Sequence, residues 1–316
     1  MGQKLCAPGP SQPGSNSSLP VAPPSLPKAH RGSVLTCGWL GSRLITGGDD
    51  HLVALTTIHN PPSSTPPAPV DLRGHTRSVN GCCGSLQTNL VYSCSRDTTV
   101  RSWHSNGSPC CTFHGHTLTV TSVCISPTGS TLVSGGRDYA VKLWDPESGR
   151  CTSTSKVSRN LVTGLCYFQD STQRFCQTSE DLTLRIWDVR TISNQSTHAS
   201  AAVTFKKYVY FPLDCDASDC GGYLCTGSKG FEAVNGCEVT LWDVRVAGEP
   251  VKVLKGHSQD VVGSCFVRVE GGGDKMMVSA SKDGSVRLWD GEGVGGELAS
   301  FEGKGKEVWT KVRAFP

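Results

Sequence analysis

Three sets of histidine, serine and aspartate recur along this 316-residue chain, and these residue types could perform nucleophilic catalysis. The sets are His75, Ser93 and Asp97; His116, Ser134 and Asp138; and His257, Ser279 and Asp283. A serine activated by a histidine that an aspartate orients is the arrangement of many hydrolases. A catalytic site is needed only once in a chain, however. Repetition of the whole set therefore favours a structural role.

A tryptophan follows each set, at Trp103, Trp144 and Trp289. If the four side chains are buried together, the carboxylate orients the imidazole, and the serine hydroxyl and indole N–H satisfy the remaining polar atoms. Such a chain of hydrogen bonds stabilises a structural unit and leaves no free nucleophile. We therefore expect no catalytic residue in these sets.

Three further patterns suggest ligand sites, and each lacks a required part. Gly291–Gly296 fits a dinucleotide fingerprint, but a strand pattern rather than a helix follows it, which predicts a β-turn. Cys110–His116 contains metal-binding residue types, yet His116 already belongs to the second His-Ser-Asp set, and no second pair of Cys or His residues stands at zinc-finger spacing. Asp214–Asp219 lacks the glycine and the bidentate glutamate of a calcium loop, which predicts a plain turn between strands. We expect no metal and no cofactor.

The elements that would position these residues are short strands in a repeated unit. The tryptophans at 103, 144, 187, 242 and 289 are separated by 41, 43, 55 and 47 positions. This spacing is close to the period of a four-stranded propeller blade, and the longest interval indicates an insertion. Residues such as Val120–Ile125 are strand formers with period-two alternation. The sequence therefore predicts an all-β fold.

The dipeptides that open and close these units resemble WD40 repeats. Glycine-histidine pairs open three of them at Gly74-His75, Gly115-His116 and Gly256-His257. Tryptophan-aspartate pairs close four of them at Trp144-Asp145, Trp187-Asp188, Trp242-Asp243 and Trp289-Asp290. The resemblance implies a WD40 β-propeller in which each Asp, His, Ser and Trp set forms the family's structural tetrad. Seven repeat starts are expected, near His30, His75, His116, Ser158, His198, His257 and Gly305.

Some repeats depart from the pattern. The seventh has one strand pattern, at 308–316, so we expect an incomplete seventh blade at the C-terminus. The first repeat has His30, Thr46 and Asp50 but Thr56 in place of tryptophan. The fourth has Gln177, Asp181 and Trp187 but Ser158 in place of histidine. We expect these two blades to be less stable than the others.

A candidate interaction face follows from the same resemblance, which places the turn aspartates, the histidine loops and a long fifth-repeat loop at 228–238 on one face. Its candidate residues are Asp49, Arg96, Arg137, Arg159, Asn160, Glu180, Phe231 and Lys282. This mixed-charge set suits the polar groups of another protein. Ordinary solvated turns remain the alternative.

Composition bounds the remaining possibilities. The 30 basic and 27 acidic residues give no broad basic surface, so no nucleic-acid partner is expected. Neither a membrane-spanning apolar run nor a signal peptide is evident, so the sixteen cysteines are expected to stay reduced. Residues 1–28 contain seven prolines and five serines and are predicted to form a disordered arm. The propeller would span 29–316, with a Pro-rich loop at 59–70.

The start of the chain contains two candidate lipidation sites. Gly2 could accept myristate after removal of Met1, although Cys6 stands where serine or threonine is preferred. Cys6 could itself accept palmitate, and two acyl chains anchor a protein far better than one. An unmodified arm is the alternative.

Three segments carry a narrower resemblance, namely Val157–Val162, Gln177–Asp188 and Gly236–Arg245. They are similar to the family of WD repeat-containing protein 31. That resemblance implies a non-catalytic scaffold in ciliary trafficking, intraflagellar or of membrane cargo, that works with regulators of small GTPases. Together with the candidate lipidation sites, it predicts a cytoplasmic protein whose acylated N-terminus associates with membrane at the cilium or its base. A general cytosolic adaptor, such as a ubiquitin-ligase substrate receptor, is the alternative, and an enzyme is the third class.

Overall fold

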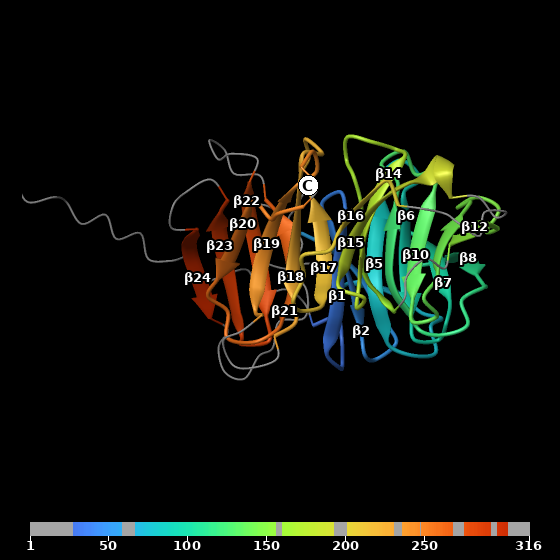
Figure 1. Ribbon diagram of the computed structural model, residues 1–316. Helices are drawn as coiled ribbons and strands as arrows, with labels where there is room; N and C mark the ends of the chain where they lie inside the picture. Colours follow the sequence, from blue (N-terminus) through green and yellow to red (C-terminus); the bar gives the residue numbers. More distant parts are fainter. Residues whose placement is uncertain are drawn as a thin grey trace, which may run out of the picture.

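The computed structural model describes residues 28–58, 67–155, 160–192, 201–230, 236–246, 248–267, 275–291 and 296–302. These residues form six four-stranded sheets, in which the antiparallel strands pair in chain order, together with one 3₁₀ helix, η1 (Val189–Thr191) (Figure 1). Each sheet is one blade of a β-propeller. Within this described part, no helix is long and apolar enough to cross a membrane.

The first three blades lie between residues 34 and 155. Blade 1 contains β1 (Val34–Leu40), β2 (Arg43–Gly48), β3 (Val53–Thr57) and β4 (Val70–Leu72). Blade 2 contains β5 (Val79–Ser85), β6 (Leu90–Ser95), β7 (Val100–His104) and β8 (Pro109–Phe113). Blade 3 contains β9 (Val120–Ile125), β10 (Leu132–Gly136), β11 (Val141–Trp144) and β12 (Cys151–Ser155).

The last three blades lie between residues 162 and 302. Blade 4 contains β13 (Val162–Tyr167), β14 (Arg174–Ser179), β15 (Thr183–Asp188) and β16 (Val203–Phe205). Blade 5 contains β17 (Pro212–Ala217), β18 (Tyr223–Ser228), β19 (Glu238–Asp243) and β20 (Lys252–Lys255). Blade 6 contains β21 (Val261–Phe266), β22 (Met276–Ser281), β23 (Ser285–Asp290) and β24 (Glu297–Glu302).

The core lies between successive blades, because the surfaces that neighbouring sheets turn toward each other are apolar. In blade 5 the face toward blade 6 is buried and consists of Cys225, Val239, Leu241 and Leu254. These side chains pack with three buried residues of blade 6, Val261, Met277 and Trp289. The innermost strands contact one another in chain order from β1 through β5, β9, β13 and β17 to β21. Packing therefore passes from each blade to the next.

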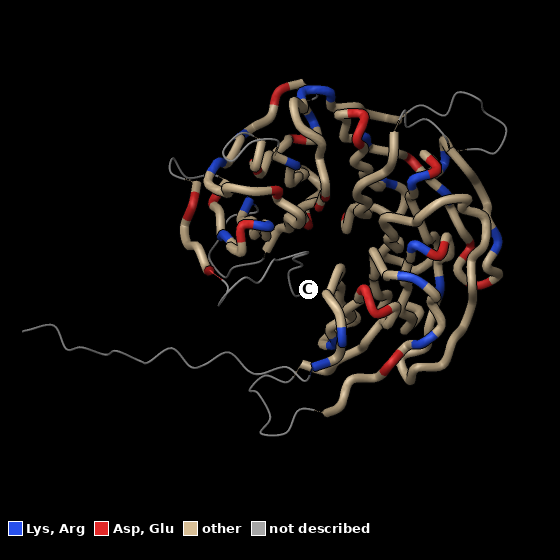
Figure 2. Tube along the Cα trace, turned by 90° about the horizontal axis from the view of Figure 1, so that it is seen from below, with Lys and Arg blue, Asp and Glu red and all other residues tan. Residues whose placement is uncertain are grey.

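Blade 6 presents the equivalent face without such burial. The pairing of strands within each blade shows which positions are equivalent. The counterparts in blade 6 of the four blade 5 residues are Val278, Val286, Leu288 and Phe301. The first three are only half-buried, and Phe301 is 62% exposed. Leu254, its counterpart in blade 5, is 4% exposed. Figure 2 shows the described trace curving around the centre as an incomplete ring.

The structure corrects the expected number of blades. The described residues form six sheets rather than seven, and the seventh repeat start, Gly305, lies outside them. Four of the innermost strands, β1, β5, β9 and β21, begin four residues after a histidine, namely His30, His75, His116 and His257. β17 begins four residues after Tyr208, so the fifth repeat starts there and not near His198, itself outside the described residues. Tyr208 follows Trp187 by 21 positions, whereas His116 follows Trp103 by 13, and no histidine marks the fifth start, so the spacing in the sequence placed this start too early.

Other expected segments take the following places. Residues 1–27 of the predicted arm and 59–66 of the Pro-rich loop are outside the description, and the latter loop connects β3 to β4. The long fifth-repeat loop connects β18 to β19. Asp214 and Asp216 lie within β17, so the predicted turn begins only after Ala217. Gly291 and Gly296 flank an undescribed stretch between β23 and β24.

Candidate functional site

The four side chains of the blade 3 set meet between its strands and the loop before β9. His116 Nδ1 lies 2.9 Å from Asp138 Oδ2, and its Nε2 lies 2.7 Å from Ser134 Oγ. The Trp144 indole N–H donates to the same Ser134 Oγ at 2.8 Å. Because Ser134 is completely buried and is held by both neighbours, no substrate can reach it. The arrangement is a structural hydrogen-bond chain.

The same chain is present in blades 2 and 6. In blade 2, His75 contacts Asp97 at 2.7 Å and Ser93 at 2.8 Å, and Trp103 donates to Ser93 at 2.9 Å. In blade 6 the distances are 3.1 Å for His257–Asp283, 2.7 Å for His257–Ser279 and 2.7 Å for Trp289–Ser279. All twelve residues predicted as tetrad members thus lie in three local sets.

Each tetrad aspartate also fixes the turn between the second and third strands of its blade. Asp97 Oδ1 accepts from the Thr99 backbone N–H at 3.0 Å, and Asp97 Oδ2 accepts from Thr76 N–H at 3.1 Å. The intervening Thr98 has φ +69°, a left-handed conformation that costs a non-glycine residue energy. Blade 6 places Gly284 there, at φ +83°, where a side chain is absent.

Electrostatics at these sets favour ionised aspartate. Burial is the largest influence on the Asp283 carboxyl and opposes its ionisation. Hydrogen bonds from Ser285, Ser258 and His257 together outweigh burial and lower its pKa to about 2. The pKa values of Asp97 and Asp138 are lowered by similar donors against the same opposing burial. Desolvation lowers the pKa of His257, which favours its neutral form.

Blades 1 and 4 contain altered sets. In blade 1, His30 keeps its contacts with Asp50 at 2.9 Å and Thr46 at 2.8 Å, and Thr56 replaces the tryptophan. Blade 4 instead joins Trp187 to Gln177 Oε1 at 2.7 Å and Arg185 to Asp181 at 2.7 Å. Ser158, expected at the histidine position, is outside the described residues. Arg185 thus pairs with the turn aspartate of blade 4 as histidine does in blades 2, 3 and 6.

Blade 5 contains a set that sequence inspection missed. Tyr208 Oη lies 2.9 Å from Thr226 Oγ1, to which the Trp242 indole N–H also donates at 3.4 Å. The spacing could have revealed this set. Tyr208 precedes Trp242 by 34 positions and Thr226 precedes it by 16, each six more than the corresponding spacings of 28 and 10 in blade 3. The inserted loop accounts for the same difference in both.

The candidate interaction residues that the structure describes lie at one end of the propeller, which we call the turn face. It carries the turns between second and third strands and the loops that precede the innermost strands. Backbone N–H groups join turn to loop, from Arg96 to Ser78 at 3.0 Å and from Arg137 to Thr119 at 2.8 Å, for example. The same bond positions three further turn residues, Asp49, Glu180 and Lys282.

Of the remaining candidates for this face, Asn160 lies two residues before β13, and its side-chain Oδ1 accepts a hydrogen bond from Leu161 N–H at 2.8 Å. Arg159 and Phe231 are outside the described residues, as are Gly2 and Cys6. Figure 2 shows positions of both charge signs around the ring. The structure therefore brings Asn160 and the five turn residues to one face.

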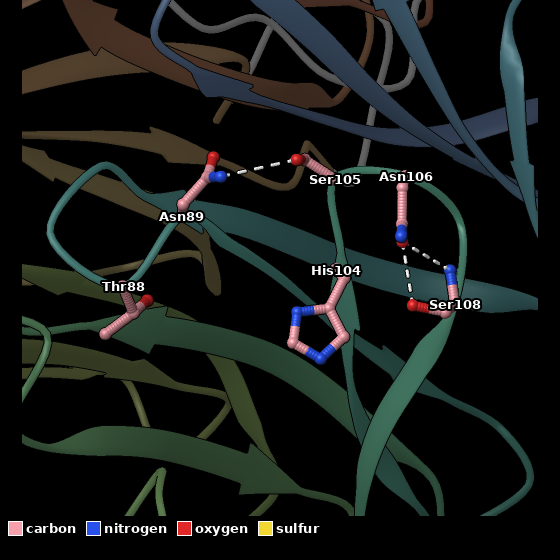
Figure 3. A pocket seen from close by; sticks show the side chains of 6 residues that line it. All are labelled: Thr88, Asn89, His104, Ser105, Asn106 and Ser108. Atoms are coloured by element: carbon pink, nitrogen blue, oxygen red, sulfur yellow. Dashed lines mark hydrogen bonds between the residues drawn. The ribbon is translucent and has the colours of Figure 1, made fainter.

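One other place could hold a ligand, and it contains no set of residues arranged for catalysis. A polar pocket at the opposite end of blade 2 is lined by Thr88, Asn89, His104, Ser105, Asn106 and Ser108 (Figure 3). Its groups bond mainly to each other, as when Asn106 Oδ1 accepts from the Ser108 hydroxyl at 2.7 Å. Among the described residues, no group of three or more His, Cys, Asp or Glu side chains could hold a metal ion.

Comparison with known proteins identifies the repeats. Residues 69–104, 107–145 and 248–290 match the family described as WD domain, G-beta repeat. Together with the six described blades, this match shows an all-β WD40 β-propeller. Propellers of this kind are generally non-catalytic platforms that bind proteins.

Several curated proteins share part of the repeat region. Periodic tryptophan protein 2 of Arabidopsis thaliana is 30% identical over 45% of this chain and 14% of its own length. Nuclear distribution protein nudF of Aspergillus niger is 28% identical over 46% of this chain and 29% of its own length. The human peroxisomal targeting signal 2 receptor is 33% identical over 23% of this chain and 21% of its own length. The chain spans less than a third of each relative, so these similarities show the repeat and not the specialised role.

Proposed function

We propose that this WD40 β-propeller is a non-catalytic scaffold whose turn face binds other proteins. One observation carries the proposal: the three His-Ser-Asp-Trp sets bury their serines completely, while each turn that their aspartates fix presents an exposed cationic side chain, Arg96, Arg137 or Lys282. The buried polar chains make a rigid support, and the exposed groups they position are suited to recognition.

The cellular process we propose is ciliary trafficking, intraflagellar or of membrane cargo, with regulators of small GTPases as partners. Its support is the narrower sequence resemblance of 157–162, 177–188 and 236–245. Gln177 is one of the residues that set these segments apart, and it occupies the tetrad serine position in blade 4. The proposed location is the cytoplasm, with membrane association at the cilium or its base.

Membrane association would come from acylation of Gly2 and Cys6. The sequence motif supports this proposal, since glycine follows the initiator methionine and a cysteine lies four residues later. Residues 7–28 would then separate the propeller from the bilayer. The partners proposed for this scaffold are proteins, and we propose no nucleic-acid partner.

Proximity labelling of the full-length tagged protein in ciliated cells tests the proposal. We expect enrichment of trafficking proteins and regulators of small GTPases. Enrichment of ubiquitin-ligase components without trafficking proteins would instead identify the cytosolic adaptor, the second candidate. If labelling yields no reproducible protein neighbours, the scaffold function itself is wrong.

A further inference from the structure

The turn face has a local excess of positive charge over blades 2 and 3. Arg77 lies in the loop before β5, Arg96 in the turn between β6 and β7, and Arg137 in the turn between β10 and β11. All three side chains are exposed. Within the part of the chain that the structure describes, none of the three makes an ion pair, whereas Lys282 on blade 6 pairs with Asp260 at 2.7 Å. Three guanidinium groups are thus available to bind anionic groups.

The backbone fixes where these arginines stand. Arg96 N–H donates to the Ser78 carbonyl next to Arg77, and the Ser95 hydroxyl donates to the Arg77 carbonyl at 3.0 Å. Blade 2 is tied to blade 3 near the same end, because Asn80 Nδ2 donates to the Val120 carbonyl at 2.9 Å. Hydrogen bonds therefore fix the backbone of the loops that carry these arginines, which reduces the conformational entropy that the loops lose on binding a partner.

Two exposed apolar side chains accompany the arginines. Leu118, in the loop before β9, is 52% exposed, and Tyr139, in the turn after Arg137, is 48% exposed. Arg137 N–H donates to the Thr119 carbonyl, which holds the Tyr139 turn beside the Leu118 loop. Tyr139 also has φ +63°, an unfavourable conformation for a bulky residue. The site thus combines positive charge with apolar area.

Carboxylates limit this basic region on both sides. Asp49 of blade 1 and Glu180 of blade 4 occupy the turn positions equivalent to Arg96 and Arg137. Asp49 accepts a hydrogen bond from the Ser78 hydroxyl at the boundary between blades 1 and 2. An extended anionic surface, such as a bilayer, would meet repulsion at these two carboxylates. A short acidic segment can bind between them.

We propose that Arg77, Arg96, Arg137, Leu118 and Tyr139 form a docking site for a short acidic segment of a partner protein. Aspartate or glutamate carboxylates of that segment bind the guanidinium groups, for which charge-assisted hydrogen bonds are well suited. A leucine or phenylalanine between the carboxylates packs on Leu118 and Tyr139. This inference rests on the proposed scaffold function and specifies the chemistry of the partner.

Selection from a library of random ten-residue peptides tests the docking site, with the full-length protein as bait. We expect enrichment of peptides that carry Asp or Glu on both sides of an apolar residue. The variant R77E/R96E/R137E should bind a selected peptide about tenfold or more weakly, because each attraction becomes a repulsion. The matched variant R150E/R190E/R245E makes the same change in net charge in connections between third and fourth strands, at the opposite end. It should retain the affinity within about twofold.

A second variant separates charge from apolar contact. L118S/Y139S should weaken binding of the selected peptide while leaving its dependence on salt concentration unchanged, because the arginines remain. Circular dichroism melting of every variant establishes that each is folded before its binding is compared.

Three outcomes would overturn the assignment. Selection of basic or uncharged peptides contradicts the proposed partner chemistry, and equal binding by the two triple variants contradicts the location. Binding of phosphatidylserine vesicles that R77E/R96E/R137E abolishes, with no acidic peptide selected, would identify a membrane site instead. These results leave the scaffold proposal standing. Failure of the wild-type protein both to select peptides and to label neighbours would refute the scaffold itself.

Discussion

The Tyr208 hydroxyl lies 2.9 Å from Thr226 Oγ1, and this contact replaces the His–Ser contact of blades 2, 3 and 6. Tyrosine reaches the hydroxyl from the same position, four residues before the innermost strand. Its ring also packs on Trp242 with centroids 5.1 Å apart. Blade 5 therefore keeps a buried polar chain without histidine or a tetrad aspartate among its described members.

The first prediction concerns this contact. Tyr208→Phe keeps the ring packing but removes a hydrogen bond, leaving Thr226 without its Tyr208 partner, and should lower the free energy of unfolding by about 1–2 kcal/mol. Urea denaturation measures the change. Tyr139→Phe, at a tyrosine that is half exposed, is the control and should have little effect. Equal effects of the two substitutions would contradict the assignment of Tyr208 to the buried chain.

The second prediction concerns the blade 3 tetrad. Trp144→Ala should destabilise the protein by about 3–5 kcal/mol, because it opens a cavity and removes the indole donor to Ser134. Asp138→Ala should also destabilise it, since His116 loses its carboxylate partner. Thermal melting measures both. Leu118→Ala is the control, because Leu118 lies in the same repeat and is 52% exposed. An unchanged melting temperature in the two tetrad variants would contradict the structural role of the tetrad.

The third prediction concerns acid stability. The pKa of Asp283 is about 2 in the folded protein, below the unfolded value of about 3.9, so its ionised form stabilises the fold above that unfolded value. This stabilisation is lost as pH falls from about 4 toward 2. Asp283→Asn should be less stable than wild type at pH 7, and the difference should shrink across that window. Urea denaturation at several pH values measures this difference in the free energy of unfolding. A difference that stays constant with pH would show that ionisation of Asp283 does not stabilise the fold.

His257 adds a change at milder acidity. Desolvation lowers its folded pKa below the unfolded value of about 6.5, so the unfolded chain takes up the proton first as pH falls. Wild-type stability should begin to decline below that pH. His257→Gln should flatten this part of the profile. A decline of the same steepness in His257→Gln would assign it to other groups.

The fourth prediction compares two phenylalanines at equivalent positions in outermost strands. Phe113 in blade 2 pairs with Val100 and is 1% exposed, whereas Phe301 in blade 6 pairs with Val286 and is 62% exposed. Phe113→Ala should cost about 3–5 kcal/mol. Phe301→Ala should change stability by less than about 1 kcal/mol, because its ring is largely in water already. A large loss for Phe301→Ala would mean that this face is covered in solution.

The fifth prediction concerns the N-terminus. Gly2→Ala should release the protein to the cytosol, because it removes the myristate acceptor. Cys6→Ser removes the palmitate acceptor but supplies the preferred residue for myristoylation, so weak and exchanging membrane association should remain, with an association constant of about 10⁴ M⁻¹. Cell fractionation and intact mass measure these states. A wild-type protein that is wholly cytosolic and carries no acyl chain would refute the anchor.

The amino-acid sequence by itself determined the repeat and its internal chemistry. His116, Ser134, Asp138 and Trp144 lie within one unit of the chain, and the short turns between adjacent strands leave few ways to arrange them. Their spacing therefore indicated both the blade and its polar chain. The same spacing failed in blade 5, because the insertion and the change of histidine to Tyr208 removed both local signals at once.

Only the tertiary structure decided which units meet and which surfaces remain open. The number of blades depends on packing between distant parts of the chain, and among the described residues that packing ends at the face of blade 6 that carries the exposed Phe301. The grouping of Arg77, Arg96 and Arg137 depends on two adjacent blades turning the same end toward solvent. Arg77 and Arg137, 60 positions apart, come to lie at the same end of adjacent blades through inter-blade packing, which no pattern within one repeat can specify.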